Sequence, residues 1–400
     1  MNRRGVITAA ALAAAALGGA RATQAQQPAP APDPAPAPAP PAPAPEAPAA
    51  SAPAAESRGT QAETTTTATP AGEHESKSRW HGTILLFDQS ATTQTLHLGR
   101  DYQSYNPTYE LWVAFKPRYF LYETKSSALS LNAWANVYLE LTNSDTTTQQ
   151  REPLLGPTYV WASYARTFQQ GKETKTVLAA GPRAVLPTDK AALGSGLIIG
   201  AGASASASQY FGLRGGNARL FKIARLGGGA IYNHPFTTAT STTNENIQQL
   251  RQDVAGRTIL SDQLTGAMQV KHALSLTASG DLRILPQWEF ALSYVWLQAW
   301  AYAPPKVQIQ LPTGPVDPMT VPDPTTYRVS TWATASLTYE PDDAFNISLG
   351  YYNLAGQIGP DGTRRNPLWS PNARVFLTVT GNMDIIYDRY KGKGDRSRSN

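Results

Sequence analysis

Residues 129–143 show the most regular alternation of apolar and polar positions in the chain. Every odd position from Leu129 to Leu141 is apolar, and the even positions between them are polar, amphipathic or charged. Successive side chains of a β-strand point to opposite faces, so this segment has one apolar and one polar face. The segment is longer than a typical soluble strand, which has about 5–6 residues, and longer than the about 9–11 residues that cross a bilayer as a strand. The pattern predicts a transmembrane β-strand with lipid on one side and water on the other.

Similar alternation recurs along the chain, and turn residues bound each segment. The first, sixth and seventh segments alternate less clearly than the others, and the sixth has small residues on both faces. We predict an all-β fold, an antiparallel transmembrane β-barrel of about twelve strands. The predicted strands cover residues 83–96, 109–122, 129–143, 158–168, 174–186, 197–210, 219–232, 263–279, 288–302, 327–339, 345–354 and 373–387.

The connections between these strands alternate in length. Outer-membrane barrels have short periplasmic turns and longer external loops. The short connections are 123–127, 169–172, 214–217, 282–287 and 340–344. The longer ones are 99–107, 144–157, 187–196, 234–262, 304–325 and 357–372. This order predicts an even number of strands with both chain ends on the periplasmic side.

Tryptophan and tyrosine lie on the predicted strands, often near strand ends, as in the interfacial girdles of membrane barrels. Trp112, Trp134 and Tyr138 are exceptions, because they fall on the polar, inward parity of their strands. The alternative is the aromatic core of a soluble β-sandwich. Strands of this length with a polar inner face favour the membrane barrel.

The chain before the barrel has two further parts. Residues 1–25 are typical of a secretory signal peptide, with Arg3 and Arg4 before an Ala/Leu-rich stretch and a small-x-small cleavage site ending at Ala22. Residues 26–79 form a Pro/Ala- and then Ser/Thr-rich segment that cannot bury apolar area, so we predict a disordered linker. The barrel is assigned to residues 80–390 and a basic flexible tail to 391–400. In the periplasm, the linker is either a tether that contacts the cell wall or a partner, or a passive spacer.

Composition narrows the function classes. The 400 residues include no cysteine, which removes disulfides, thiolate metal sites and a catalytic thiol. Charged residues make up 16%, below the about 25% of average globular proteins. The net charge of +5 owes several positive charges to the leader and the tail, so we expect no nucleic-acid partner. After the leader no apolar run is long enough for a transmembrane helix.

With the leader, the alternating strands and the alternating connections, the chain resembles the porin-like outer-membrane β-barrel proteins of Gram-negative bacteria over roughly residues 80–390. It is also similar to barrel proteins assigned as transporters, and its Ala/Pro-rich leader is similar to envelope proteins of myxobacteria or of other high-GC bacteria. The resemblance implies outer-membrane location and contact with lipid. The final strand of this class usually ends the chain on an aromatic residue, whereas here ten residues follow Tyr390.

An enzyme is not expected, because the five histidines lack a serine and acid pattern and no nucleophile elbow is present. We expect no metal site and no cofactor. The acidic residues of the loops have no regular oxygen-ligand spacing.

The charged residues on the inward parity are the candidate site. They are Glu110, Lys116, Arg118, Glu140, Lys175, Arg183, Lys271, Arg374 and Asp384. Rings of charge set the selectivity of pores, and the excess of cations predicts a mild anion preference. The sequence therefore favours a channel or transporter for small solutes. Two alternatives stay open: a non-conducting structural or adhesive barrel whose inner charges pair with one another, and an outer-membrane enzyme.

Overall fold

A computed structural model gives the architecture of the chain. The residues that it describes are 78–93, 95, 108–142, 151–170, 174–212, 223–240, 248–252, 258–262, 268–303, 310–311, 314–315, 326–356, 366–370 and 373–398. The predicted signal peptide and nearly all of the predicted linker lie outside them.

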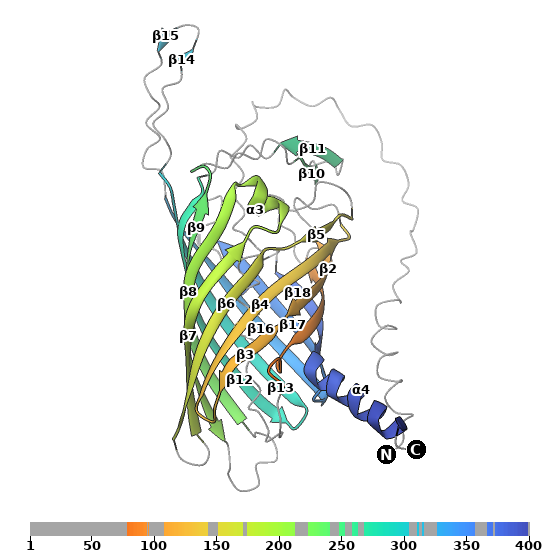
Figure 1. The fold of residues 1–400 in the computed structure, drawn as a ribbon. Helices are drawn as coiled ribbons and strands as arrows, with labels where there is room; N and C mark the ends of the chain where they lie inside the picture. The colour runs from red at the N-terminus through yellow and green to blue at the C-terminus, as the bar shows by residue number, and fades with distance from the viewer. Residues whose placement is uncertain are drawn as a thin grey trace, which may run out of the picture. The chain divides into compact units, whose positions relative to one another are not determined.

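The described strands form the wall of a closed antiparallel β-barrel (Figure 1). The wall has twelve strand positions, one of which is shared by two short strands, β2 (Tyr109–Lys116) and β3 (Arg118–Glu123). Each wall strand pairs with its neighbours in sequence, and the first strand pairs with the last, which closes the wall. The wall strands are β1 (Ile84–Thr92), β2 (Tyr109–Lys116) with β3 (Arg118–Glu123), β4 (Ser127–Glu140), β6 (Thr158–Gln169), β7 (Thr174–Leu186), β8 (Leu197–Gly212), β9 (Ile223–Thr237), β12 (Val270–Leu285), β13 (Trp288–Ala301), β16 (Tyr327–Asp342), β17 (Phe345–Gly356) and β18 (Arg374–Asn382). The predicted fold class and strand number are confirmed.

Proline explains why one wall position consists of two strands. Pro117 separates β2 from β3, and both pair with β4. Proline has no backbone N–H, so it cannot donate a ladder hydrogen bond. Its carbonyl still accepts a hydrogen bond from the N–H of Ala133, at 3.1 Å, so the wall remains continuous there.

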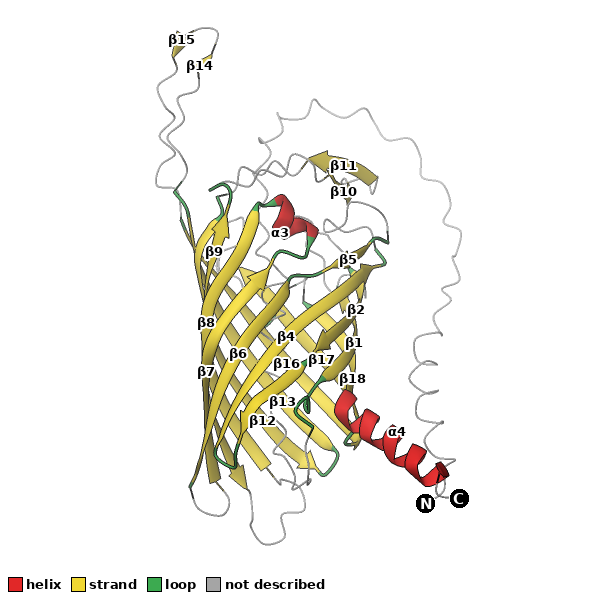
Figure 2. Cartoon of the chain, in the orientation of Figure 1, coloured by secondary structure: helices red, strands yellow, loops and turns green. Residues whose placement is uncertain are grey.

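The two ends of the barrel differ in their connections (Figure 2). At one end, the short-turn end, β12 and β13 are joined by two residues, as are β16 and β17. The opposite end, the long-connection end, carries α3 (Lys190–Gly194), β5 (Pro153–Leu155) and two small hairpins, β10 (Gln248–Gln252) with β11 (Thr258–Asp262) and β14 (Gln310–Leu311) with β15 (Gly314–Pro315). No helix within the described ranges is long and apolar enough to cross a membrane.

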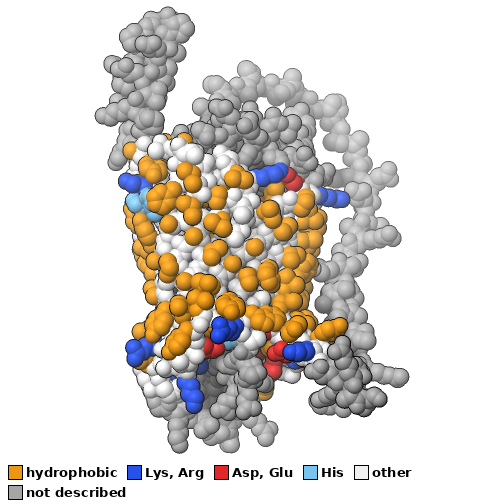
Figure 3. Space-filling model, in the orientation of Figure 1, with side chains coloured by type: hydrophobic (Ala, Val, Ile, Leu, Met, Phe, Trp, Pro, Cys, Tyr) orange, Lys and Arg blue, Asp and Glu red, His pale blue; other side chains and the backbone are white. Residues whose placement is uncertain are grey.

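The outer face of the wall is apolar and exposed. Figure 3 shows a broad hydrophobic surface over the strands, with charged side chains mainly near its two margins. Among the outward side chains, Leu276 is 38% exposed and Leu292 50%. The neighbouring inward residues are polar and buried, as Ser275 and Thr277 are on β12. A wall with this inside-out polarity suits lipid outside and polar groups inside.

The C-terminal end of the barrel corrects one strand prediction. The last strand, β18, ends at Asn382, and α4 (Met383–Arg398) follows, whereas the alternation was extended to residue 387. Ile385 and Ile386 are adjacent apolar residues, which a two-residue repeat does not accommodate. The ring of Tyr387 packs edge-on against Trp80, with the ring centroids 5.5 Å apart. Residues 391–398, predicted as a flexible tail, belong to this helix.

Other strand boundaries differ by a few residues. The strand predicted at 219–232 runs from Ile223 to Thr237, and the strand predicted at 263–279 runs from Val270 to Leu285. The turn after β12 is therefore limited to Pro286 and Gln287. This shift matters for the site, because it places residues 281 and 283 on the wall.

Candidate pore lining

Strand register identifies the side chains on the inner face of the barrel. Directly opposite residues on paired strands point to the same side. Ser90 is opposite Glu110 on one neighbouring strand and Phe376 on the other, and Glu110 is opposite Glu140. The register places Glu110, Lys116, Arg118, Glu140, Lys175, Arg183 and Arg374 on this face, which is the parity predicted for them.

A first group of charges lies near the long-connection end of the inner face. Arg374 of β18 reaches across β1, and its Nη1 lies 2.7 Å from a carboxylate oxygen of Glu110 on β2. The carboxylate of Glu140 accepts a hydrogen bond of 2.6 Å from the hydroxyl of Thr142. Glu110 and Glu140 are both buried, so their charges depend on these inner-face contacts.

Four inner-face cations lie over aromatic rings. Their distances to the ring centroids are 5.5 Å for Lys116 over Trp161, 4.5 Å for Arg118 over Phe120, 4.7 Å for Lys175 over Tyr210 and 4.5 Å for Arg183 over Tyr159. A cation within about 6 Å of a ring centroid is attracted by the ring quadrupole. These contacts position the four cations on the inner face of the wall between β2 and β8.

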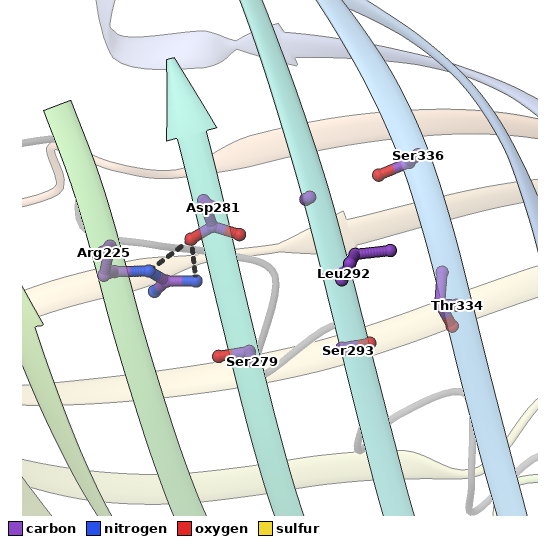
Figure 4. A pocket seen from close by; sticks show the side chains of 8 residues that line it. Arg225, Ser279, Asp281, Leu292, Ser293, Thr334 and Ser336 are labelled. Carbon is purple, nitrogen blue, oxygen red and sulfur yellow. Dashed lines mark hydrogen bonds and ion pairs between the residues drawn. The ribbon is translucent and has the colours of Figure 1, made fainter. Parts of the chain in front are cut away.

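A second group of charges pairs with carboxylates on the opposite part of the wall. Figure 4 shows the guanidinium of Arg225, on β9, directed at the carboxylate of Asp281, on β12, and the two form an ion pair. Both side chains are largely buried. They line a cavity of about 10 Å³ with Ser279, Ser293 and Thr334, which is roughly the space for one water molecule.

Arg283 continues this second group toward the short-turn end. Its Nη2 lies 2.6 Å from a carboxylate oxygen of Glu340 and 3.6 Å from one of Glu289. Sequence reasoning missed Arg225, Asp281, Arg283, Glu289 and Glu340. The apolar–polar alternation of β12 continues through Asp281 and Arg283, so the sequence does carry a signal for these two residues, although residues 282–287 were predicted as a turn.

Aromatic residues fill much of the inner face between these charges. One cluster comprises Trp112, Trp134, Tyr159, Trp161 and Val185, with Tyr138 packed against it. A second comprises Val295, Trp332, Tyr352 and Phe376. The three aromatics that departed from the girdle pattern, Trp112, Trp134 and Tyr138, are thus inner-face residues.

Two predicted site residues are placed differently from the others. The prediction for Asp384 assumed a strand through residue 387, but this residue lies in the first turn of α4, so strand parity does not assign it to the inner face. Lys271 is exposed, and the pairing of β12 with β13 shifts register between Val270 and His272. Its Nζ lies 5.9 Å from the centroid of the Tyr302 ring. A bulge of this kind interrupts the parity rule.

Comparisons with known proteins found similarity only in structure. No family model matches the chain, and no curated protein matches it in sequence. Its structure is similar to that of the COG4313 outer membrane channel from Pseudomonas putida F1, with a TM-score of 0.42, 11% identity and coverage of 78% of this chain and 98% of the channel. It is also similar to the NanC porin, with a TM-score of 0.33, 7% identity and coverage of 75% and 99%. For the TodX deltaS2S3 mutant, a monoaromatic hydrocarbon channel, the TM-score is 0.34, the identity 9% and the coverage 76% and 91%. The assignment as a barrel rests on the strand pairing of this chain.

Proposed function

We propose that this protein is an outer-membrane β-barrel channel through which small solutes pass along a charged lumen. The observation that carries the proposal is the contrast between the two faces of the wall. The outer face is an apolar surface suited to lipid, and among the described wall residues the inner face carries slightly more cations than carboxylates. The cations are Lys116, Arg118, Lys175, Arg183, Arg225, Arg283, Arg328 and Arg374, and the carboxylates are Asp88, Glu110, Glu123, Glu140, Asp281, Glu289 and Glu340.

Fixed inner-face charges act on a solute by replacing part of its hydration. An aromatic ring attracts a cation without neutralising it, and each ion pair with a carboxylate contributes little to the net field. The lumen therefore favours anions over cations. Passage of a solute through such a lumen requires no chemical step.

The proposal includes an orientation. The short-turn end of the wall, from which α4 extends, would face the periplasm, and the long connections would face outward. The Pro/Ala-rich segment at 26–79 would then be periplasmic, within reach of the cell wall. Protease accessibility of this segment in intact cells, compared with lysed cells, tests the orientation.

A second candidate is a barrel that conducts nothing and serves a structural or adhesive role. Three observations favour it: the ion pair of Arg374 with Glu110, the ion pair of Arg225 with Asp281, and the burial of both aromatic clusters. A small barrel can fill its own interior with side chains. The two candidates differ in one measurable property, which is ion conduction.

Single-channel recording in a planar bilayer tests the proposal. Refolded protein, shown to be folded by heat-modifiable gel migration, should give stable open steps in KCl. Under a KCl gradient, the reversal potential should move toward that of chloride, because the inner face carries excess positive charge. Silent bilayers with folded protein would exclude the channel and leave the structural barrel.

Asp281→Asn provides a prediction about selectivity. The change removes one inner-face negative charge and leaves Arg225 without its carboxylate partner. We expect the chloride-to-potassium permeability ratio to rise by about two-fold, through the added positive field. Asp343→Asn is the control, because Asp343 is exposed in the short turn between β16 and β17. An unchanged ratio in folded Asp281→Asn protein would place this residue outside the conducting path.

A further inference from the structure

Two histidines lie side by side on the outer face of the barrel. His234 on β9 and His272 on β12 extend a ladder in which Asn233 pairs with Ala273 and Tyr232 with Leu274. The same parity that puts Leu274 on the lipid side puts both imidazoles there. Tyr232 precedes His234 by two residues, so its side chain shares that face.

The three side chains converge on a small volume. The Nδ1 atoms of His234 and His272 are 3.2 Å apart, and the hydroxyl of Tyr232 is 2.7 Å from Nδ1 of His272. The imidazole centroids are 4.9 Å apart with the rings tilted by 34°. Two nitrogens of neighbouring imidazoles thus approach each other, with a phenol oxygen beside one of them.

This spacing suits a shared metal ion. Two imidazole nitrogens, each about 2.0–2.1 Å from a tetrahedral metal, lie about 3.3 Å from one another. Imidazole is a favoured ligand of Zn²⁺, Ni²⁺ and Cu²⁺. We propose that His234 and His272, with Tyr232 beside them, bind a divalent transition-metal ion on the outer face of the barrel. Water would complete the coordination shell.

The two imidazoles can bind a metal ion without releasing a proton to solvent. Of two neutral imidazoles joined Nδ1 to Nδ1, one donates its proton and the other accepts it. Binding needs a lone pair on both Nδ1 atoms. The donating ring meets this requirement by moving its proton to Nε2, so both rings stay neutral ligands.

Other side chains of the wall lie around the two histidines. His234 is opposite Ala201 on β8, and His272 is opposite Trp300 on β13. Phe236 packs edge-on against His234, with the centroids 4.6 Å apart. Lys271 adjoins His272 and is the nearest cation in sequence. Within the described part of the chain, no three His, Cys, Asp or Glu residues form a metal cluster, so this site has only two imidazoles and one phenol as protein ligands.

The location indicates what binding would do. His234 lies three residues before the end of β9, and His272 lies two residues after the start of β12. These two strands carry the two ends of the connection that contains β10 and β11. A metal ion held by both strands would tie the two ends of that connection together where they leave the wall.

Copper titration of the refolded, tag-free protein tests the site. One Cu²⁺ per barrel should bind, and its electron paramagnetic resonance spectrum should show coupling to two imidazole nitrogens. His234→Asn and His272→Asn should each weaken binding by more than about ten-fold and remove the two-nitrogen signature, because each removes a ligand. Tyr232→Phe should keep that signature and weaken binding by a smaller factor.

The matched control is His81→Asn, near the short-turn end of the barrel. His81 has a carboxylate beside it, with its Nε2 3.5 Å from Glu123, but no second histidine lies near it among the described residues. This variant should bind Cu²⁺ like the unchanged protein. If the unchanged protein binds no Cu²⁺, or if the His234 and His272 variants bind as it does, the two histidines form only a hydrogen-bonded pair. Heat-modifiable migration shows that each variant is folded, and conductance is expected to be the same in all of them.

Discussion

Trp332→Ala should lower the free energy of unfolding by about 3–5 kcal/mol, the range for removing a buried large aromatic side chain. Trp332 is 1% exposed on the inner face of β16. Its ring stacks on Tyr352 with the centroids 5.0 Å apart, and its Nε1–H donates a hydrogen bond of 2.8 Å to the hydroxyl of Thr334. The substitution removes both contacts and leaves space in the second aromatic cluster.

The same substitution should enlarge the conducting path. Urea unfolding of protein folded in lipid vesicles measures the stability change, and single-channel recording measures the conductance. Trp296→Ala is the matched control, because Trp296 is a tryptophan of the neighbouring strand on the outer face and is 39% exposed. Equal losses of stability in the two variants would contradict the assignment of Trp332 to a packed interior. An unchanged conductance would place its cluster away from the narrowest part of the lumen.

Leu276→Arg should destabilise the folded barrel in a bilayer by about 2–4 kcal/mol, the range for a lipid-facing arginine near the membrane midplane. Leu276 lies near the middle of β12, on the outer face opposite Trp296 and Ala230. An arginine there must leave water for lipid, or bend toward a distant interface.

Leu276→Ala separates this effect from the loss of apolar area. It removes the same leucine but introduces no charge, so its loss of stability should be much smaller. Unfolding in vesicles of two acyl-chain lengths sharpens the comparison, because the cost of the arginine depends on its depth. Equal stability of the arginine and alanine variants would show that residue 276 does not face lipid.

The barrel could be predicted from the sequence because a two-residue repeat indicates both that a segment is a strand and which face each side chain is on. The alternation in residues 129–143 placed Asn132, Asn136 and Glu140 on one face, and the register of β4 with β2 and β6 agrees. The repeat holds only while the backbone stays extended. It therefore misassigned residues 383–387, where the chain enters a helix, and it did not anticipate the break at Pro117.

The pairing of inner-face charges was not predictable in the same way. Parity gives the face of a residue but not its neighbour across the sheet, which depends on register. Arg225 and Asp281 are 56 positions apart and meet because β9 and β12 pair with one particular offset. A one-residue slip between these two strands would place Arg225 and Asp281 on opposite faces of the wall. The two histidines are likewise separated by a long connection, so their proximity depends on the register of β9 with β12.

The closing pair of strands constrains the order in which this protein can assemble. Asp88 of β1 accepts a hydrogen bond from Thr378 of β18, and the two residues are 290 positions apart. The entropy of joining such distant segments is lost before their contacts form, although this cost grows only slowly with separation. Every hairpin of the wall can form from local contacts, but the seam requires both ends of the barrel. Until the seam closes, β1 and β18 are open edges able to pair with other chains. The risk of aggregation is therefore concentrated in the interval between completion of β18 and its capture by β1.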